Sequence, residues 1–270
     1  MIQCNVKIID LSHYCLFIFE KLIYVRMYDF IEKQNLLYTK LFGFRKKHST
    51  SHALISLTES IKKSLDDKQK VAGVFIDLEK AFDTVNHKIL CDKLSYYGFR
   101  GKINNLIDSF LTNRFQYVSI NGFDSAPLPI HFGVPQGSTL GPLLFILYIN
   151  DLRFCLRYST ASHFADDTCL TYACNKLKTL ETNLNYDLNN FKKWLDANRL
   201  SLNIGKTKLL LFHSKNDKLS KNISIKIKGK IIEPSKCIKY LGIYIDDNLS
   251  WDKHIAELRI KLSKVNGILS

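Results

Sequence analysis

The order of hydrophobic and polar residues predicts two helices and then a buried strand in the first 80 residues. Apolar residues recur at helical spacing from Leu16 to Ile31 and again from Leu54 to Leu65. The Ser-Thr-Ser segment at 49–51 can cap the start of the second helix. Residues 71–78 form an apolar run that is typical of a buried strand, and Asp77 interrupts it near its end.

Helices and a hairpin alternate in the middle of the chain. We expect Asp83-Thr84 to cap a helix from about Asn86 to Tyr97, which Gly98 ends. The other elements expected here are a helix at 102–111, a hairpin of 115–120 and 126–131 about Asn121-Gly122, a glycine- and proline-containing loop at 133–141 and a helix at 143–149. The last helix is apolar on every side and should therefore be buried.

The last third of the chain predicts a second set of strands and helices. Apolar stretches at 158–164 and 168–172 predict two strands joined by a tight turn. The elements expected after them are an amphipathic helix at 177–195, a half-exposed strand at 223–227, a strand at 237–245 and a helix from Trp251 onward. The whole pattern predicts an α+β fold in which helices cover one side of a sheet.

The tight turn carries the strongest chemical signal, the adjacent pair Asp166-Asp167. Two like charges at the end of a hairpin repel each other, and a bound cation relieves that repulsion. Asp77 ends another predicted strand, so three carboxylates would converge if that strand lies beside the hairpin. Converging carboxylates can hold the two divalent ions of a phosphoryl-transfer site. The ordinary alternatives are a solvated turn for the pair and a turn-capping role for Asp77.

Composition favours a globular protein with a polyanionic partner. The 270 residues are 46% hydrophobic and 12% aromatic, and they carry a net charge of +14. This charge favours nucleic acid over a membrane surface as the partner. Seven cysteines without a Cys-x-x-Cys pair indicate reduced thiols in an intracellular protein, and we find no signal peptide or membrane-spanning run. No clear signal in the sequence distinguishes a nuclear from a cytoplasmic location.

Six groups of residues, in order along the chain, resemble the motifs of one enzyme family. They are Phe42-Gly43-Phe44-Arg45 with Ser49-Thr50 and Ala53-Leu54; residues 74–83; residues 133–138 with 140–145 and 148–152; Phe164-Ala165-Asp166-Asp167; Asn203 with Lys206-Thr207-Lys208; and Lys239-Tyr240-Leu241-Gly242. With these motifs the chain from about Glu20 onward resembles the reverse transcriptases of non-LTR (LINE, jockey-type) retrotransposons. Six motifs in the family's order make chance a poor explanation, whereas a lone Asp-Asp pair would be weak evidence.

The resemblance implies a right-hand polymerase palm, which is an antiparallel sheet backed by helices, with partial helical fingers. It places partial fingers at 1–70, the catalytic palm with fingers elements at 71–247 and the start of a thumb at 248–270. Residues 1–19 lack the family's Arg-Pro-Ile-Ser segment, and the length leaves no room for an endonuclease domain. We therefore expect a fragment or a decayed copy of such an element.

The implied reaction extends a DNA primer on an RNA template with deoxynucleoside triphosphates. By resemblance it uses two Mg²⁺ ions, for which Mn²⁺ can substitute, and the sequence indicates no membrane and no obligate protein partner.

The resemblance also assigns roles to residues. The catalytic metal ligands would be Asp77, Asp166 and Asp167, with the backbone carbonyl of Leu78 nearby. Phe82 would exclude a ribose 2′-hydroxyl, Gln136-Gly137 would lie next to the base and template, and Lys206 or Lys208 would lie near the pyrophosphate leaving group. Arg45 and Lys46 would contact the template backbone, and Tyr240-Leu241-Gly242 would hold the primer end. The alternatives are core packing for Phe82, solvated positions for the basic residues and an ordinary strand at 240–242. We read Asp83 as structural.

Two other functions stay open at this point. A catalytically idle remnant could still bind nucleic acid through its basic surface. A palm that makes a cyclic nucleotide would share the paired acidic ligands, but it would have no use for the motifs at 136–137 and 240–242. A phosphate-binding P-loop at 133–139 does not fit, because no lysine precedes Ser138-Thr139.

Overall fold

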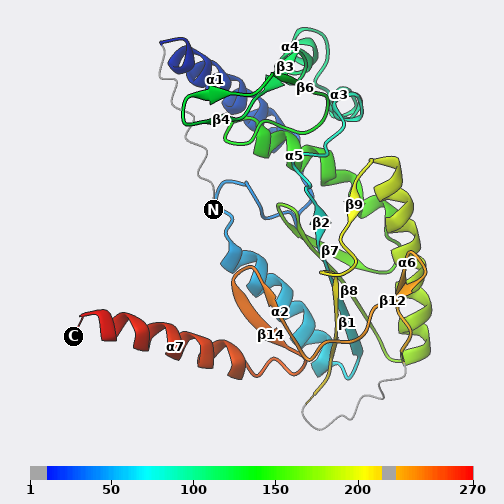
Figure 1. Ribbon diagram of the computed structural model, residues 1–270. Helices are drawn as coiled ribbons and strands as arrows, with labels where there is room; N and C mark the ends of the chain where they lie inside the picture. The colour runs from blue at the N-terminus through cyan, green and yellow to red at the C-terminus, as the bar shows by residue number, and fades with distance from the viewer. Residues whose placement is uncertain (1–10, 215–222, 270) are drawn as a thin grey trace. The chain divides into compact units, whose positions relative to one another are not determined.

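The structure, a computed structural model, describes residues 11–214 and 223–269, with side chains for 17–214 and 223–264 (Figure 1). The expectations for residues 1–10 and for the Cys4 and Cys15 thiols lie outside this description. Helices and strands alternate along the chain, which confirms a mixed helix-and-sheet fold. The chain forms two compact units, each built from several segments. One contains Met1–Tyr38, Lys80–Asp151 and Ala197–Leu200, and the other contains Thr39–Glu79, Leu152–Asp196 and Ser201–Ser270.

The second unit is built on a four-stranded antiparallel sheet. Its strands, in spatial order, are β10 (Lys208–Phe212), β1 (Lys70–Ile76), β8 (Asp167–Cys174) and β7 (Thr160–Phe164). Every residue of β1 after Lys70 is buried, because this strand lies inside the sheet and is covered on both faces. The predicted buried strand and the predicted hairpin around Asp166-Asp167 are therefore confirmed.

Helices cover both faces of this sheet, so the expectation of helices on one side was wrong (Figure 1). On one face, α2 (Thr50–Asp66) packs Leu57 and Ile61 against β1 and against the hairpin of β13 (Cys237–Tyr240) and β14 (Ile243–Asp246). On the other face lies α6 (Leu177–Ala197), whose Asn183 donates a hydrogen bond to the Tyr172 hydroxyl at 2.8 Å. Apolar residues at consecutive positions of β1 require cover on both faces, and the sequence supplies two amphipathic helices for it.

A fully buried carboxylate ties α6 to the start of β7. Asp187 is 0% exposed and accepts backbone N–H bonds from Arg157 at 2.9 Å, Tyr158 at 3.0 Å and Ser159 at 2.5 Å. A carboxylate that loses its water needs such donors, and charge-assisted hydrogen bonds are the stronger ones. Asp187 thereby fixes the chain as it enters the strand that leads to Asp166.

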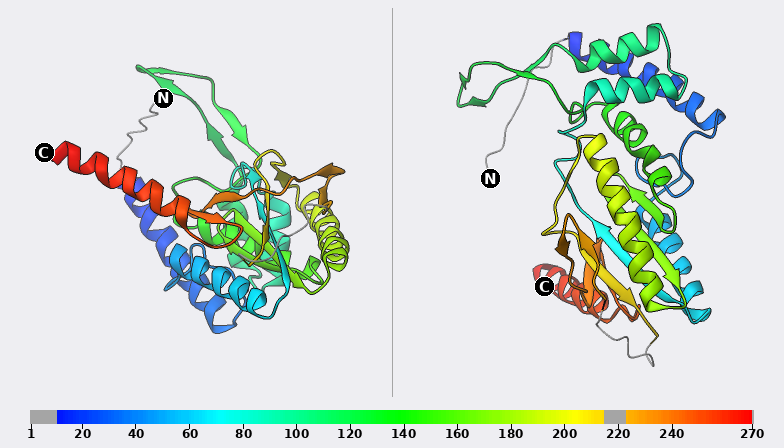
Figure 2. Two further views of the ribbon diagram at one scale, coloured as in Figure 1. Left: turned by 90° about the horizontal axis from the view of Figure 1, so that it is seen from below. Right: turned by 90° about the vertical axis from the view of Figure 1, so that its right-hand side faces the viewer.

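The first unit is mainly helical. Its helices are α1 (Leu11–Lys33), α3 (His87–Tyr96), α4 (Lys102–Leu111) and α5 (Gly141–Ile149). All residues of α5 except Pro142 are buried, as its continuous apolar sequence predicts. The predicted hairpin about Asn121-Gly122 has two parts, β4 (Ser119–Ile120) with β5 (Phe123–Asp124) and β3 (Arg114–Gln116) with β6 (Leu128–Ile130), and it projects away from α3 and α4 (Figure 2).

The cap of α3 differs from the one expected. Asn86, not Asp83, is the N-cap: its side chain accepts a hydrogen bond from the backbone N–H of Ile89 at 3.0 Å. The Asp83 carboxylate instead accepts a hydrogen bond from the Gln136 side chain at 2.7 Å. Both aspartate and asparagine suit an N-cap, so propensity alone could not choose between them.

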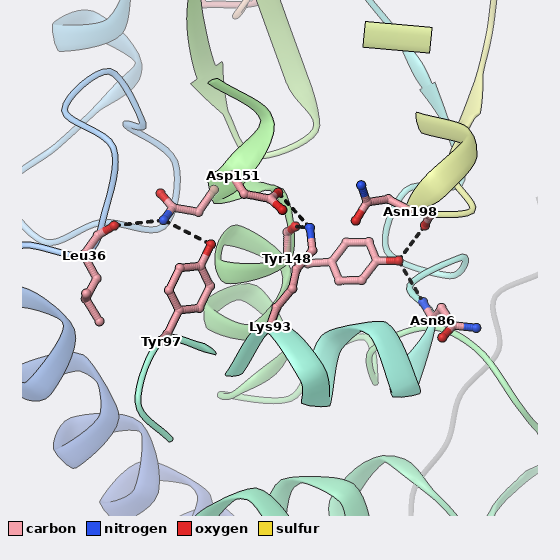
Figure 3. Close-up of polar contacts among 8 residues, drawn as sticks. Leu36, Asn86, Lys93, Tyr97, Tyr148, Asp151 and Asn198 are labelled. Carbon is pink, nitrogen blue, oxygen red and sulfur yellow. Dashed lines mark hydrogen bonds and ion pairs between the residues drawn. The ribbon is translucent and has the colours of Figure 1, made fainter. Parts of the chain in front are cut away.

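The Tyr148–Asp151 segment at the end of α5 joins several elements of the first unit (Figure 3). Lys93 donates to the Tyr148 carbonyl at 2.6 Å and to the Asp151 carboxylate at 2.7 Å. The Tyr148 hydroxyl donates to the Asn198 carbonyl at 2.5 Å, and the Asn150 amide donates to the Leu36 carbonyl at 2.9 Å. Burial lowers the pKa of Lys93 although Asp151 opposes this effect. This part of the family-like motif is thus a structural junction.

Shorter elements complete the fold. They are the 3₁₀ helix η1 (Asn150–Cys155), the pair β2 (Leu78–Glu79) and β9 (Ser201–Leu202), the pair β11 (Lys226–Ile227) and β12 (Lys230–Ile231), and α7 (Asp252–Leu269). The half-exposed strand expected at 223–227 is only two residues long, although Ile223, Ile225 and Ile227 are buried as its alternation predicts. Across the described residues, no helix combines the length and apolar character that crossing a bilayer requires.

We predict that Asp187→Asn destabilises the protein by about 2–3 kcal/mol, because the amide NH₂ would face buried N–H donors. Chemical denaturation measures this loss. The matched control is Asp196→Asn on the same helix, where an exposed ion pair with Lys192 should contribute less than about 1 kcal/mol. Equal losses in the two variants would contradict the buried role of Asp187.

Candidate active site

The register of the central sheet brings Asp77 beside the acidic turn. In the antiparallel pair of β1 and β8, Ile76 lies opposite Thr168, so the next residue of one strand, Asp77, faces the preceding residue of the other, Asp167. Phe164 pairs with Asp167 across the hairpin, which leaves Ala165 and Asp166 as the turn itself. Asp77 is half-buried, whereas Asp166 and Asp167 are exposed.

Asp77 and Asp167 line one cavity of about 480 Å³ in the second unit. The rest of its lining comes from β1, β10, β13 and the segments just before β10 and β13: Phe75, Ile76, Gly205, Lys206, Lys208, Ser235, Cys237, Ile238, Lys239 and Tyr240. Five of the predicted site residues are therefore brought together here, two carboxylates, two lysines and Tyr240. The cavity combines oxygen ligands for a cation with ammonium groups for an anion.

Although the residue is exposed, partial desolvation of its carboxyl group and two neighbouring carboxylates, Asp166 and then Asp77, raise the pKa of Asp167 to about 6. Asp166 and Asp77 therefore disfavour ionisation of Asp167. Carboxylate oxygens are the donors that Mg²⁺ and Mn²⁺ take, so the residues present fit a divalent ion in kind. In the part of the chain that the structure describes, no three His, Cys, Asp or Glu side chains are grouped closely enough to hold a metal ion.

The backbone of Asp77 is held by the loop that carries the two lysines. The Asn203 N–H donates to the Asp77 carbonyl at 2.9 Å, and the buried Thr207 hydroxyl lies 3.5 Å from the Asp77 nitrogen. The Asn203 side chain accepts the Lys206 N–H at 3.2 Å, and the Lys208 ammonium donates to the Gly205 carbonyl at 3.1 Å. The loop is therefore ordered by its own hydrogen bonds.

The segment expected as one strand at 237–245 is a hairpin, which corrects the prediction. Tyr240 and Ile243 pair across a two-residue turn in which Leu241 has φ +47° and Gly242 has φ +86°. Positive φ at both central residues defines the turn type that suits the right-handed twist of a hairpin. Tyr240 is buried and its ring packs edge-on to Phe75 at 5.0 Å, while Leu241 and Gly242 lie outside the cavity lining.

Three predicted nucleotide-binding residues lie in the first unit. Phe82 is half-buried and stacks on Phe145 with ring centroids 4.1 Å apart. Gln136 and Gly137 are exposed, and Gly137 has φ +84° with open space where a Cβ would point. Backbone bonds from Val134 to Phe82 at 2.9 Å and from Gly133 to Val85 at 2.8 Å hold this loop against the segment that carries Phe82.

The remaining predicted residues lie away from the cavity lining. Leu78 is buried and pairs with Leu202 in β2–β9. Arg45 and Lys46 lie in a turn closed by the His48 N–H bond to the Arg45 carbonyl at 3.2 Å and by the His48 ring bond to the Lys46 carbonyl at 2.9 Å. Lys46 is exposed and Arg45 half-buried.

Sequence reasoning missed the residues that hold the predicted ligands in place. The Thr207 hydroxyl accepts a hydrogen bond from the Asp77 backbone, and the Asp83 carboxylate accepts one from the Gln136 side chain. Gly43 lies against the backbone of the acidic turn. For Thr207 and Asp83, the available signal was that each is a short polar residue next in sequence to a predicted site residue. For Gly43 the signal was a glycine between two aromatic residues, Phe42 and Phe44.

Comparison with known sequences identifies the family. The sequence profile of the family described as reverse transcriptase (RNA-dependent DNA polymerase) matches residues 13–245, so the chain belongs to this family. Its relatives include a probable RNA-directed DNA polymerase from transposon BS of Drosophila melanogaster, 32% identical over 88% of this chain and 27% of the relative. The polymerase from the mobile element jockey of the same species is 27% identical over 85% of this chain and 26% of the relative.

The resemblance to polymerases of non-LTR retrotransposons is therefore confirmed, and by family the chain is an RNA-directed DNA polymerase domain. It spans about a quarter of the length of these relatives.

Solved structures show the same fold. Apo telomerase from Candida tropicalis, truncated from its C-terminal domain, aligns with a TM-score of 0.58 at 14% identity over 86% of this chain and 44% of that chain. Telomerase from the same species in complex with a fragment of telomeric RNA aligns with a TM-score of 0.55 at 11% identity over 86% of this chain and 36% of that chain. At these identities the likeness concerns the fold alone.

We predict that Mn²⁺ raises the melting temperature more at about pH 7.5 than at about pH 5. Because the folded pKa of Asp167 is raised to about 6, the folded metal-free chain loses stability as the pH rises from the ordinary aspartate range through 6. A cation that binds the ionised carboxylates removes this cost, but protons displace it at low pH. Melting curves with and without Mn²⁺ measure the difference.

The control for this measurement is Asp167→Asn, in which the Mn²⁺-dependent rise should be small and nearly independent of pH. A wild-type rise of equal size at both pH values would show that Asp167 does not contribute to cation binding.

Proposed function

We propose that this chain catalyses RNA-templated extension of a DNA primer, with the acidic end of the central sheet as its active site. One observation carries the proposal: the register of β1 and β8 places Asp77 and Asp167 on the wall of one cavity, beside Lys206, Lys208 and Tyr240. In this proposal the central sheet belongs to the palm at 71–247, with fingers at 1–70 and the start of the thumb at 248–270.

Asp77, Asp166 and Asp167 would hold the divalent cations, with the Leu78 carbonyl as a further oxygen donor. When bound, two such ions neutralise triphosphate charge and activate the primer 3′-hydroxyl, which is the general mechanism of this fold. The chain supplies the geometry. Asn203 and Thr207 fix the backbone of Asp77, and the sheet fixes Asp167 opposite it. Lys206 and Lys208 border the same cavity, where an ammonium group can stabilise or protonate the leaving pyrophosphate.

The other predicted residues would bind the nucleotide and the nucleic acid. Phe82, held by its stack on Phe145, would lie under the sugar and exclude a 2′-hydroxyl. Gln136-Gly137 would contact the base, since the glycine allows close backbone approach. Arg45 and Lys46 would bind the template backbone, and the Tyr240-Leu241-Gly242 turn would hold the primer end. Support for these assignments comes from the family motifs.

An RNA template, a DNA primer and deoxynucleoside triphosphates are the partners that follow from the family. The net charge of +14 favours such polyanions, and a telomerase of the same fold has been solved with RNA. Mg²⁺ would be the ion used, with Mn²⁺ as a substitute.

Primer extension on an RNA template tests the proposal. We expect the wild-type chain with Mg²⁺ or Mn²⁺ to extend the primer and Asp166→Ala/Asp167→Ala to lose at least about 100-fold of that rate, because two ion ligands are removed. The matched control is Asp66→Ala/Asp67→Ala, since this pair is also adjacent and exposed but lies at the end of α2. It should keep wild-type activity.

Equal extension by the wild type and the Asp166/Asp167 variant would indicate a contaminating polymerase. Salt-sensitive RNA binding without any extension would support the alternative of an idle nucleic-acid-binding remnant.

Asp83 should matter for nucleotide affinity rather than for the chemical step. Its carboxylate holds the Gln136 amide at 2.7 Å, so Asp83→Ala frees that side chain and should raise the KM for deoxynucleotides about three- to tenfold with little change in kcat. Asp83→Asn keeps an acceptor oxygen and should stay near the wild type. An unchanged KM in Asp83→Ala would show that the Asp83–Gln136 hydrogen bond does not contribute to nucleotide binding.

A further inference from the structure

A short segment before α2 pairs with the strand that leads to the acidic turn. We call residues 39–44 the strap. The His163 N–H donates to the Lys40 carbonyl at 2.9 Å, the Phe42 N–H donates to the His163 carbonyl at 2.8 Å, and Leu41 forms a parallel bridge with His163. Leu41 and Phe42 are buried. The strap is therefore anchored to β7 by backbone hydrogen bonds and by apolar burial.

Gly43 lies directly on the backbone of the turn. A Cβ atom at Gly43 would lie 2.2 Å from the Ala165 nitrogen, 2.9 Å from the Phe164 carbonyl carbon and 3.1 Å from the Ala165 Cα. All three neighbours are backbone atoms, which cannot rotate away as the end of a side chain can. Only a residue without a side chain fits this contact.

The turn has little freedom to adapt on its other side. Ala165 has φ +57°, a left-handed conformation that is unfavourable for a residue with a Cβ, and it is buried. Its neighbour His163 is also buried and bonds through its ring to the Thr168 hydroxyl at 3.0 Å, across the hairpin. The turn is thus held by the strap on one side and by the hairpin on the other, and the next residue is Asp166.

We propose that Gly43 is a positioning residue for the catalytic turn. Its missing side chain lets the strap fix the backbone of Ala165, and thereby the position from which Asp166 and Asp167 present their carboxylates to a cation. A methyl group at position 43 must move the turn by about 1 Å, and a misplacement of that size can reduce a catalytic rate about 100-fold. The effect on the reaction rests on the proposed polymerase activity, whereas the effect on cation binding rests only on the proposed carboxylate site.

Gly43→Ala tests this inference with two readouts. Mn²⁺ binding, followed by electron paramagnetic resonance, should weaken about tenfold, because the turn presents its carboxylates from a displaced backbone. In primer extension, kcat should fall about 10- to 100-fold while the KM for primer and template changes less than about twofold. If the role of Gly43 were purely structural, Gly43→Ala would lower stability without a fall in kcat at nearly constant KM.

The matched control is Gly73→Ala in β1 of the same sheet. A Cβ there would meet ring atoms of Phe212 at 3.0 Å and Phe75 at 3.1 Å, which are side chains and can shift. We expect Gly73→Ala to lower the melting temperature and to leave Mn²⁺ affinity within about twofold of the wild type.

Each outcome decides a specific claim. Wild-type Mn²⁺ affinity in Gly43→Ala would overturn the positioning role. A wild-type chain that binds Mn²⁺ but extends no primer would refute the polymerase activity alone, and the Mn²⁺ comparison would still decide the role of Gly43. Wild-type Mn²⁺ affinity no better than that of Asp166→Ala/Asp167→Ala would overturn both.

A second variant covers a folding failure. In Gly43→Ala/Ala165→Gly, a glycine at the left-handed position lets the turn move without strain. We expect this variant to fold and to bind Mn²⁺ about tenfold more weakly than the wild type, and full affinity would overturn the proposal. Loss of folding in both variants would assign Gly43 to folding alone and would also overturn it.

Discussion

Side chains alternate between the faces of the sheet β10-β1-β8-β7, so a shift of β1 by one residue would turn each of its side chains, and that of Asp77 after it, to the opposite face. The observed register places Phe75 toward α2 and the β13–β14 hairpin, and the same alternation carries Asp77 to the cavity. Because hydrophobic packing selects this register, it also selects where the carboxylate lies. The position of the Asp77 carboxylate therefore depends on the apolar packing of the strand that carries it.

The electrostatics of the cavity combine two opposing requirements. Desolvation, and then the charges of Asp166 and Asp77, raise the pKa of Asp167. Lys206, Lys208 and Lys239 line the same cavity on a chain of net charge +14. In the proposed function, the basic surroundings would attract polyanions from solution, and cations at the acidic centre would let a phosphate approach. In the proposed function, basic residues would attract the nucleic acid and the aspartates would bind the metal ions.

Local sequence predicted most elements because their signals are local: helical spacing for α1, α2 and α6, a continuous apolar run for β1 and α5, and Asn121-Gly122 for a hairpin. The family motifs pointed to Asp77 and the lysines, which the structure brings to one cavity. Other features depend on contacts distant in sequence. Asp83 bonds to a residue 53 positions away instead of capping α3. In the turn at Leu241-Gly242, the leucine has a positive φ, which a strand does not have. The local sequence there is an apolar run, so it predicted one continuous strand instead of a turn. The contact of Gly43 with Ala165 becomes visible only once the strap pairs with β7.

Ala165 adopts a left-handed φ of +57°, which costs a residue with a Cβ about 1–2 kcal/mol. The pairing of β7, β8 and the strap offsets this free-energy cost, because nothing in the local sequence favours the left-handed conformation. Fraying of the sheet edge would release the strain, whereas the centre of the sheet would lose little. Native-state opening should therefore begin at the acidic turn, in the kind of sub-global unfolding that leaves the core intact. The turn that carries two of the proposed metal ligands would then also be among the first segments to exchange its amide hydrogens with solvent.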